Sequence, residues 1–149
     1  MKESYVVYLD SLGTKDRMAD LDGTKLPADL ELLSHRWFLQ HEDGEADYQR
    51  FLSFTDNVVV GTPVVTDRYG ERGYGLGMLL NSVGAYQMNM TARGEFIRGA
   101  VSRGPLYMDD RTVTGSALVD AVILEEGVAS YPRVVLSQSC VEVVLATPQ

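Results

Sequence analysis

One apolar stretch near the start of the chain constrains the fold more than any other feature of the sequence. Residues 5–9 are all valine, tyrosine or leucine, a composition typical of a buried β-strand. The stretch ends abruptly at Asp10, and a glycine, a hydroxyl and a cation follow within five residues. A carboxylate at the point where a strand passes into a loop is well placed to hold a cation. We therefore expect Asp10 to lie at a ligand-binding edge of a sheet.

The segment after Asp10 is expected to bind an anion. A short helix is predicted over residues 15–21, and the first N–H groups of a helix have no partner within it. The N–H groups in question belong to the turn formed by Leu12, Gly13, Thr14 and Lys15. A metal ion beside a phosphate is typical of a nucleoside triphosphate site. Taken alone, however, the segment is equally consistent with Asp10 acting only as the N-cap of that helix.

A second segment favours a metal site. Residues 50–60 predict two strands joined by a tight turn at Asp56 and Asn57, because Asx residues tolerate the positive φ that such turns require. Asp10 and Asp56 would then each lie at a strand edge, in a chain short enough to bring them together. Two facing carboxylates repel each other unless divalent cations lie with them. We predict that Asp10 and Asp56 form one metal site.

The composition narrows the class of protein. A chain of 149 residues, of which 45% are hydrophobic, predicts one globular domain over residues 1–149. The net charge of -8 argues against a nucleic-acid surface, so an anionic substrate has to be received by a local metal and a few bases. Cys140 is the one cysteine of the sequence, which favours a reducing compartment and a cytoplasmic location. We find no signal core and no apolar run of about 20 residues, and we expect no membrane contact.

The remaining pattern predicts an α+β fold. Helices are expected over residues 28–41, about 75–92, 116–126 and 138–145, and strands over residues 96–104, 105–108 and 132–136. The strands at 96–104 and 105–108 are expected to pair with each other, and Gly127 is expected to stop the helix that begins at residue 116. Helices that alternate with a mostly antiparallel sheet give a sandwich, with the sheet on one side and the helices on the other. Its centre is predicted to be a ferredoxin-like β-α-β-β-α-β unit, in which the first strand and the first hairpin lie side by side.

Four motifs lie in order along almost the whole chain. The first is a strand followed by Asp-x-x-Gly at residues 9–14, and the second is a hairpin with an Asp at its turn at residues 54–57. The third covers residues 97–104, and the fourth covers residues 115–121 with Leu124 and Glu125. Together they resemble the motifs of the class III nucleotidyl cyclase domain, and the chain is most similar to the pyrimidine cyclases of bacterial Pycsar anti-phage systems. The resemblance implies a central, mostly antiparallel sheet with helices packed on it, and the activity of a phosphorus–oxygen lyase.

The resemblance also implies roles for the metal-binding and phosphate-binding residues. Asp10 and Asp56 would hold two Mn²⁺ or Mg²⁺ ions per site, and the backbone carbonyl of Ser11 would join one of them. The turn over residues 12–15 would hold the triphosphate. Arg98 and Arg103, together with Lys15, are the candidates that would meet the remaining phosphate charge. Each arginine is equally consistent with a plain surface ion pair.

Two further expectations follow from the resemblance. Tyr48, Arg50 and Phe51 are candidates for lining the base pocket. Domains of this family pair head to tail, and each active site is completed by the partner. The chain is therefore expected to form a homodimer with shared active sites.

The departures from the purine-cyclase pattern concern base selection. Purine cyclases read the base with a Lys four residues before the metal Asp and with an Asp three residues before the glycine of the fourth motif. Leu52 and Thr112 stand at these positions, and Val119 and Ile123 replace the transition-state Asn and Arg. We therefore predict a pyrimidine cyclase that converts UTP, or CTP, to a 3′,5′-cyclic nucleotide and pyrophosphate. The alternative is an inactive cyclase-like domain that binds nucleotide or a partner chain.

Overall fold

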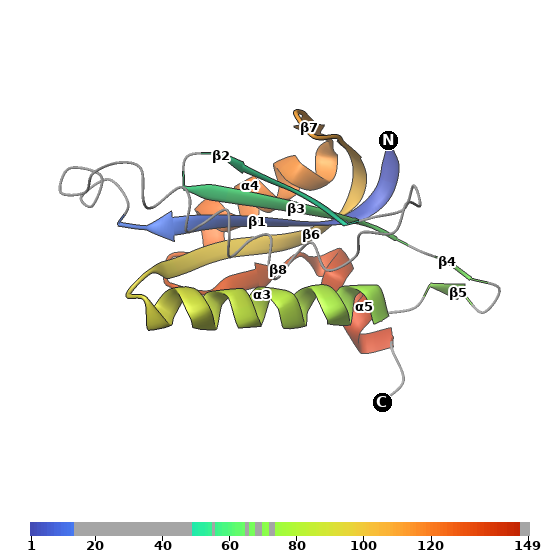
Figure 1. Cartoon of the computed structure of the whole chain (residues 1–149). Helices are drawn as coiled ribbons and strands as arrows, with labels where there is room; N and C mark the ends of the chain where they lie inside the picture. Colours follow the sequence, from blue (N-terminus) through green and yellow to red (C-terminus); the bar gives the residue numbers. More distant parts are fainter. Residues whose placement is uncertain (14–48, 55, 65, 68–69, 72–73, 147–149) are drawn as a thin grey trace.

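The sheet is built around strand β1 (Lys2–Leu12), which has a partner strand on each side (Figure 1). The computed structural model describes residues 1–13, 49–54, 56–64, 66–67, 70–71 and 74–146. Within β1, residues 4–7 are all buried, without the alternation of a strand that is wet on one face. The helices predicted over residues 15–21 and 28–41 lie outside the described residues.

The strand order confirms the predicted fold class. The sheet runs β2 (Arg50–Phe54), β3 (Asn57–Pro63), β1, β6 (Phe96–Met108) and β7 (Val113–Thr114). All of these pairs are antiparallel, whereas β8 (Val134–Leu136) pairs with β6 in parallel. The order β2-β3-β1-β6 is that of the ferredoxin-like unit, with the first strand and the first hairpin side by side as expected. A separate small pair is formed by β4 (Thr66–Asp67) and β5 (Gly70–Glu71).

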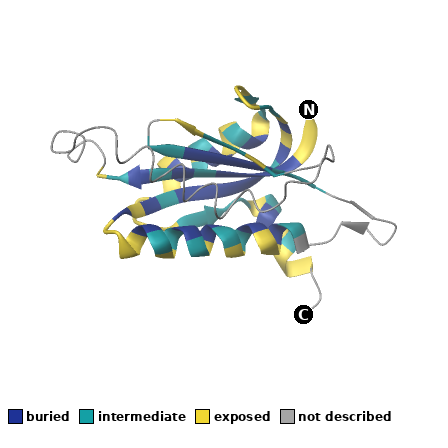
Figure 2. Ribbon diagram, viewed as in Figure 1, coloured by how far each residue is buried: buried dark blue, intermediate teal, exposed yellow. Residues whose placement is uncertain are grey.

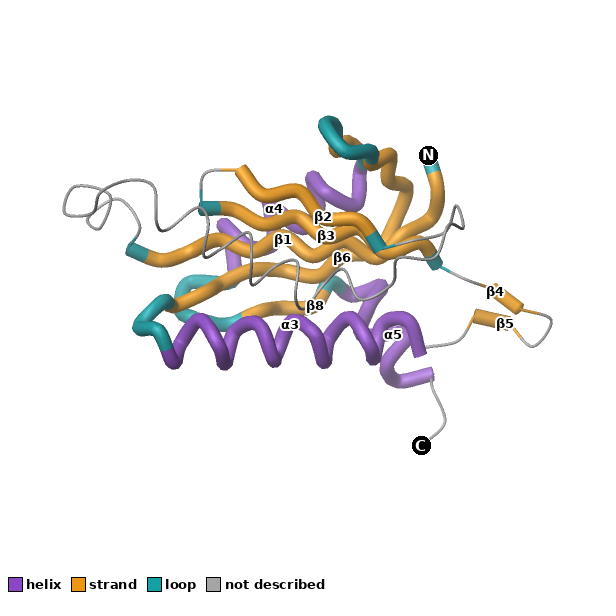
Figure 3. Tube along the Cα trace, viewed as in Figure 1, coloured by secondary structure: helices purple, strands orange, loops and turns teal. Residues whose placement is uncertain are grey.

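Helices cover both faces of this sheet. Figure 3 shows α3 (Tyr74–Ala92) running along one side of the strands, where α5 (Gln138–Ala146) also packs. The opposite face is covered by α4 (Ser116–Val128), which packs on β1 and β6. The predicted sandwich, with helices on one side only, is therefore wrong. The unbroken apolar run of residues 5–9 already argues against such a sandwich, because a strand with one solvent-exposed face alternates apolar and polar residues.

Two clusters of buried residues divide the core between the faces, and Figure 2 marks the buried positions of strands and helices in dark blue. The larger cluster joins Tyr5, Val7 and Leu9 of β1 to the buried face of α3. The smaller cluster joins Val6 to Val59 and to Ala117 of α4. Alternate residues of β1 therefore point to opposite faces, as strand geometry requires. Side chains at Tyr8 and Asp10 follow Val6 on the face of α4.

The predicted second hairpin is wrong, because residues 96–108 form a single strand. β1 pairs with β6 over its whole length, from Lys2 opposite Leu106 to Leu12 opposite Phe96. On the other side of β6, β8 pairs only at residues 99–101 and β7 only at residues 107–108. Pro105 therefore has a described strand on one side only, which is the setting in which a sheet tolerates proline.

The helix boundaries agree with the sequence except at Gly127. α4 continues through Gly127 to Val128, and the N–H of Ala129 then donates to the carbonyl of Glu125. A glycine weakens a helix by only about 1 kcal/mol, and the buried Ala129 keeps this end of α4 against the fold. Ser137 precedes α5 as predicted, and its Oγ accepts from the N–H of Cys140 at 3.4 Å. No helix in the described part of the chain has the length and apolar character needed to cross a membrane.

Candidate functional site

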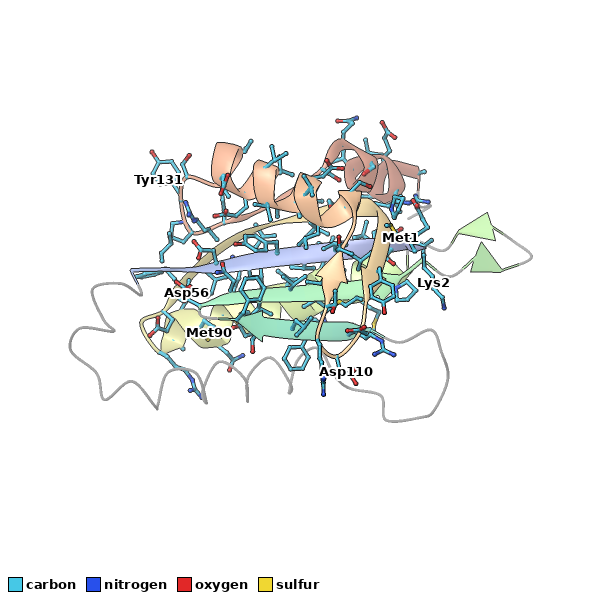
Figure 4. All side chains as sticks on the ribbon, turned by 90° about the horizontal axis from the view of Figure 1, so that it is seen from above. Met1, Lys2, Asp56, Met90, Asp110 and Tyr131 are labelled. Carbon is cyan, nitrogen blue, oxygen red and sulfur yellow. The ribbon has the colours of Figure 1, made fainter. Side chains whose placement is uncertain are left out.

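Asp10 lies near the end of β1, between two other candidate site segments. Its Cα is paired with Asn57 of β3 on one side and with Arg98 of β6 on the other. Asn57 directly follows Asp56, so the turn of the first hairpin and Asp10 share one end of the sheet. In Figure 4, Asp56 lies at the end opposite to Met1 and Lys2. Segments that are far apart in the sequence thus meet at this end because β1 is the central strand.

Arg98 forms the main polar contact of Asp10. Its Nε donates a hydrogen bond to Oδ2 of Asp10 at 3.0 Å and lies 2.5 Å from Oε1 of Glu125 on α4. The side chain of Arg98 is 28% exposed, that of Asp10 is 19% exposed and that of Glu125 is 3% exposed. The guanidinium is therefore shared by two carboxylates at the boundary between core and solvent.

Glu125 is a site residue whose place the sequence analysis missed. The fourth motif of the resemblance includes Glu125, but the sequence analysis gives it no role. In the structure the buried positions of α4 are Ala117, Ala121 and Glu125, which are spaced by four residues. This helical spacing is the signal that could have identified Glu125 as an inward-facing acid.

Burial is the main influence on the Glu125 carboxyl. It raises the pKa of Glu125 above its usual value of 4.5, because water no longer stabilises the charged form. The Arg98 guanidinium opposes that shift, whereas the charges of Asp10 and Glu126 add to it. The pKa of Glu125 is therefore set mainly by the burial of its carboxyl group and secondarily by the nearby Arg98 guanidinium.

Tyr8 links the first hairpin to an acidic cluster that consists of Asp10, Asp56, Glu125 and Glu126. Its hydroxyl donates to Oδ1 of Asn57 at 2.9 Å, which fixes the side chain that follows Asp56. Burial raises the pKa of Tyr8 above its usual value of 10.0, and the charge of Asp10 raises it further. Glu125, Glu126 and Asp56 contribute in the same direction, so Tyr8 lies in a negative field. Such a field favours a cation.

The predicted anion-binding turn is only partly described. β1 does not end at Asp10 but continues to Leu12, because Ser11 and Leu12 still pair with Ile97 and Phe96 of β6. Gly13 follows with a φ of 82°, in the left-handed region that favours glycine. The chain therefore turns at the glycine of the Asp-x-x-Gly motif. Thr14 and Lys15 lie outside the described residues.

Two of the predicted nucleotide-binding residues lie on the other face of the sheet. Phe51 packs against the larger cluster, on the side of α3. Arg103 is paired with Tyr5, whose ring it covers at 5.9 Å, and its Nε donates to Glu3 Oε1 at 3.1 Å. The structure does not bring Phe51 or Arg103 together with Asp10.

Arg50, another candidate for the base pocket, does not lie beside Asp10 either. Arg50 pairs with Asp110 at 3.0 Å and lines a pocket together with Met1, Lys2 and Tyr107. Ser4, also in that pocket, is six residues before Asp10 in β1, a separation of about 20 Å along a strand. Tyr48 lies outside the described residues.

The donor atoms at this end of the sheet are of the kind that Mg²⁺ and Mn²⁺ bind. They are all oxygens, from the carboxylates of Asp10 and Asp56 and from the carbonyl of Ser11. Among the described residues, no group of three or more His, Cys, Asp or Glu side chains could hold a metal ion by itself. The residues present therefore fit an ion that takes its other ligands from water and phosphate, as Mg²⁺ usually does in nucleotide sites.

The positions expected to read the base and the transition state have apolar or outward-facing side chains. Leu52 is half-buried in β2, and Thr112 is exposed, with its backbone N–H donating to Oδ1 of Asp109. Val119 and Ile123 lie on the outer surface of α4, where they are 56% and 62% exposed. Neither of them contributes a polar group to the cluster around Asp10.

Comparison with known proteins leaves the family of the chain open. No family model matches the sequence, and no curated protein does. Among solved structures, the guanylyl cyclase Cya2 matches with 10% sequence identity and a TM-score of 0.48. The match covers 95% of this chain and 78% of that one. A likeness of this size assigns neither a family nor an activity, so the fold class rests on the strand order.

Proposed function

We propose that this chain is a nucleotide cyclase that acts on a pyrimidine nucleoside triphosphate, with UTP preferred and CTP accepted. One observation supports the proposal above the others, namely the register of β1. Asp10 is opposite Asn57 in one neighbouring strand and opposite Arg98 in the other, so the acids of the first two motifs share one end of the sheet with a cation of the third. Asp10 and Arg98 are also in direct contact.

The reaction is an internal transfer of the α-phosphoryl group. The 3′-oxygen of the ribose forms a bond to the α-phosphorus and loses its proton, while the bond to the β-phosphate oxygen breaks and pyrophosphate leaves. Two divalent cations would lower the pKa of the 3′-hydroxyl and neutralise the leaving group. Asp10, Asp56 and the Ser11 carbonyl would hold these ions, and Arg98 would add positive charge beside the phosphates.

The chain's own contribution is mainly positioning. In-line attack requires the 3′-oxygen and the leaving oxygen to lie on opposite sides of phosphorus, so accurate placement of sugar and triphosphate supplies much of the rate. The turn at Gly13 is suited to this task, because its backbone N–H groups can approach an anion without a side chain between them.

The proposed preference for a pyrimidine base rests on two positions that offer a purine no suitable polar side chain. A purine would find the Leu52 side chain and an outward-facing Thr112 where its ring atoms need polar partners. Leaving polar groups of a substrate unpaired lowers kcat/KM for that substrate. Leu52 and Thr112 therefore disfavour ATP and GTP, and pyrimidine nucleotides remain as substrates.

The setting of this activity is a further part of the proposal. We infer a cytoplasmic homodimer with two shared sites, because Val119 and Ile123 present an apolar surface on α4 that a second copy can cover. The cyclic nucleotide would then act as a second messenger, and the resemblance to anti-phage cyclases suggests a role in bacterial defence.

A second candidate function has one observation in its favour. Asp10 already has the Arg98 guanidinium as its counter-ion, an arrangement that is stable without a metal ion. A non-catalytic domain that binds nucleotide or a partner chain is consistent with that ion pair and with the apolar Val119 and Ile123.

Incubation of the chain with α-³²P-labelled UTP and CTP in the presence of Mn²⁺ separates the two candidates. A cyclase releases pyrophosphate and forms a labelled product that resists phosphatase. A binding domain returns the triphosphate unchanged, and that result would refute the proposed enzyme. For variants that lose one carboxylate, such as Asp56→Asn, a Glu142→Gln variant at an exposed residue of α5 serves as the control for the change in net charge.

A further inference from the structure

Glu125 is a buried acid without an assigned role. The residue is 2% exposed, and its Oε1 atom has no hydrogen-bond donor in the described part of the chain. Nε of Arg98 lies 2.5 Å from that atom. A buried carboxylate is costly unless a cation accompanies it, so Arg98 is the group that makes this position tolerable for an acid.

Arg98 Nε lies between two acceptors but has only one hydrogen to donate. The hydrogen is directed to Oδ2 of Asp10 at 3.0 Å, and that contact has hydrogen-bond geometry. The contact to Glu125 is an ion pair only, because no aligned hydrogen reaches Oε1. Glu125 is thus a second acceptor, already at contact distance, for a hydrogen that Asp10 now receives.

A divalent cation at Asp10 would change this balance. The guanidinium and the metal ion would compete for one carboxylate, and two cations at that distance repel each other. A small rotation of the Arg98 side chain would redirect its hydrogen from Asp10 to Glu125. Without an acid at residue 125, Arg98 would lose the carboxylate that lies 2.5 Å from its Nε and would oppose the metal ion.

We propose that Glu125 is the positioning residue for Arg98, which it retains when a divalent cation binds to Asp10. The retained guanidinium then stays beside the site, where it can meet phosphate charge. Glu125 itself contacts neither the nucleotide nor the metal ion in this scheme. The inference rests on the proposed function for the metal site at Asp10, but it concerns only which residue receives Arg98.

A double-mutant cycle on Mn²⁺ affinity tests this role without relying on turnover. The binding of Mn²⁺ alone is followed by the electron paramagnetic resonance signal of the free ion, in mildly alkaline buffer. Glu125→Gln is expected to weaken binding by about 10- to 100-fold, the usual effect of removing a residue that supports a metal ligand. Glu126→Gln, which changes the exposed neighbouring acid, is the matched control and is expected to have a small effect.

The decisive comparison is made in the Arg98→Met background. If Glu125 acts through Arg98, adding Glu125→Gln there changes the affinity no more than Glu126→Gln does. An equal loss in both backgrounds would mean that Glu125 acts on the metal ion directly, which overturns the positioning role. No loss in either background overturns it as well. Binding that is unchanged by Asp10→Asn would instead refute the metal site, and with it both the proposed function and this inference.

A measurement on the unmodified chain guards against variants that fail to fold. The Nε–Hε resonance of Arg98 in ¹⁵N-arginine-labelled protein is assigned by its disappearance in Arg98→Lys. We expect it to remain in slow exchange with water after saturation with Mg²⁺, because Glu125 replaces Asp10 as its acceptor. Fast exchange on Mg²⁺ addition would show that Arg98 is released to solvent, and would overturn the proposal.

Discussion

Of the two carboxylates in the proposed metal site, Asp56 is the one whose substitution should disturb the fold least. It lies half-buried in a turn, and the Asn57 amide donates to its Oδ1 at a long distance of 3.5 Å. Asp56→Asn keeps the shape of the side chain and removes its charge. We expect turnover of UTP with Mn²⁺ to fall by at least about 100-fold, while urea unfolding shifts by no more than about 0.5 kcal/mol. Near-normal activity in this variant would remove Asp56 from the metal site.

The buried carboxyl of Glu125 should leave a mark on the pH dependence of stability. Its pKa in the folded chain is raised above 4.5, so the folded state keeps a proton that the unfolded state has lost. The free energy of unfolding therefore decreases as the pH rises from about 4.5 through the raised pKa, by at most about 1.4 kcal/mol per pH unit from this group. The free energy of unfolding of the metal-free chain, measured with urea at several pH values, should fall less steeply with pH in Glu125→Gln. Glu126→Gln should keep the pH dependence of the unmodified chain.

Residues were predictable from the sequence where a motif placed them at the end of a strand. The apolar stretch of residues 5–9 marks Asp10 near the end of its strand, and Arg98 was a candidate because the third motif of the resemblance contains it. Phe51 and Arg103 were assigned to the site from the resemblance, but strand alternation points them to the other face. The direction of a side chain depends on register, and a shift of one residue exchanges the faces.

At the scale of elements, the junction before α4 is expected to be the most sensitive to a single methyl group. Gly115 has a φ of 150°, and a Cβ atom there would collide with the carbonyl oxygen of Pro105 and with Cα of Leu106. Gly115→Ala should therefore destabilise the fold by about 2 kcal/mol or more. Urea unfolding measures this loss, and an unchanged midpoint would show that α4 is not held against β6 at this point.

Gly127 provides the matched control within the same helix. A Cβ atom at Gly127 would meet nothing within 4 Å, and the residue lies in the last turn of α4. Gly127→Ala should stabilise the chain by up to about 1 kcal/mol, because alanine loses less backbone entropy in a helix. Opposite signs for the two substitutions would separate strain at the junction from a general effect of alanine.

Elements were predictable when local pattern alone determined them. The strands of the first hairpin and the helices α3, α4 and α5 were found because period and turn residues mark them. The predicted division of residues 96–108 falls at Pro105, whereas pairing along the whole of β1 keeps the strand continuous. Long-range pairing overrides a local breaker when one edge of the strand is free of the ladder.

At the scale of the whole molecule, a dimer with shared active sites predicts that two inactive variants regain activity when they are mixed, which a monomeric enzyme does not. Asp56→Asn and Asp120→Ala alter the hairpin and the outer surface of α4, and Asp120 is exposed there beside Val119. If Asp120 on α4 faces the nucleotide in the partner's site, each variant alone is inactive and a mixture regains part of the activity, because a mixed dimer contains one intact site. Activity measured after mixing and re-equilibration checks this, and no recovery would contradict the shared site.

The global arrangement was only partly within reach of the sequence. The ferredoxin-like order followed from the alternation of helices and strands, which restricts the possible topologies. Coverage of both sheet faces was indicated only by the unbroken apolar run of residues 5–9, and that run does not say which helix packs on which face. Assembly between chains depends on surfaces that have no periodic signal at all.

The most direct test of the proposed pyrimidine cyclase is a competition among UTP, CTP, ATP and GTP at equal concentration with Mn²⁺. The 3′,5′-cyclic products are separated and quantified by mass spectrometry, with Asp56→Asn as the inactive reference. We predict a cyclic pyrimidine nucleotide as the main product, formed with release of pyrophosphate and absent in the variant. Comparable rates with ATP or GTP, or no cyclic product from any of the four nucleotides, would contradict this account.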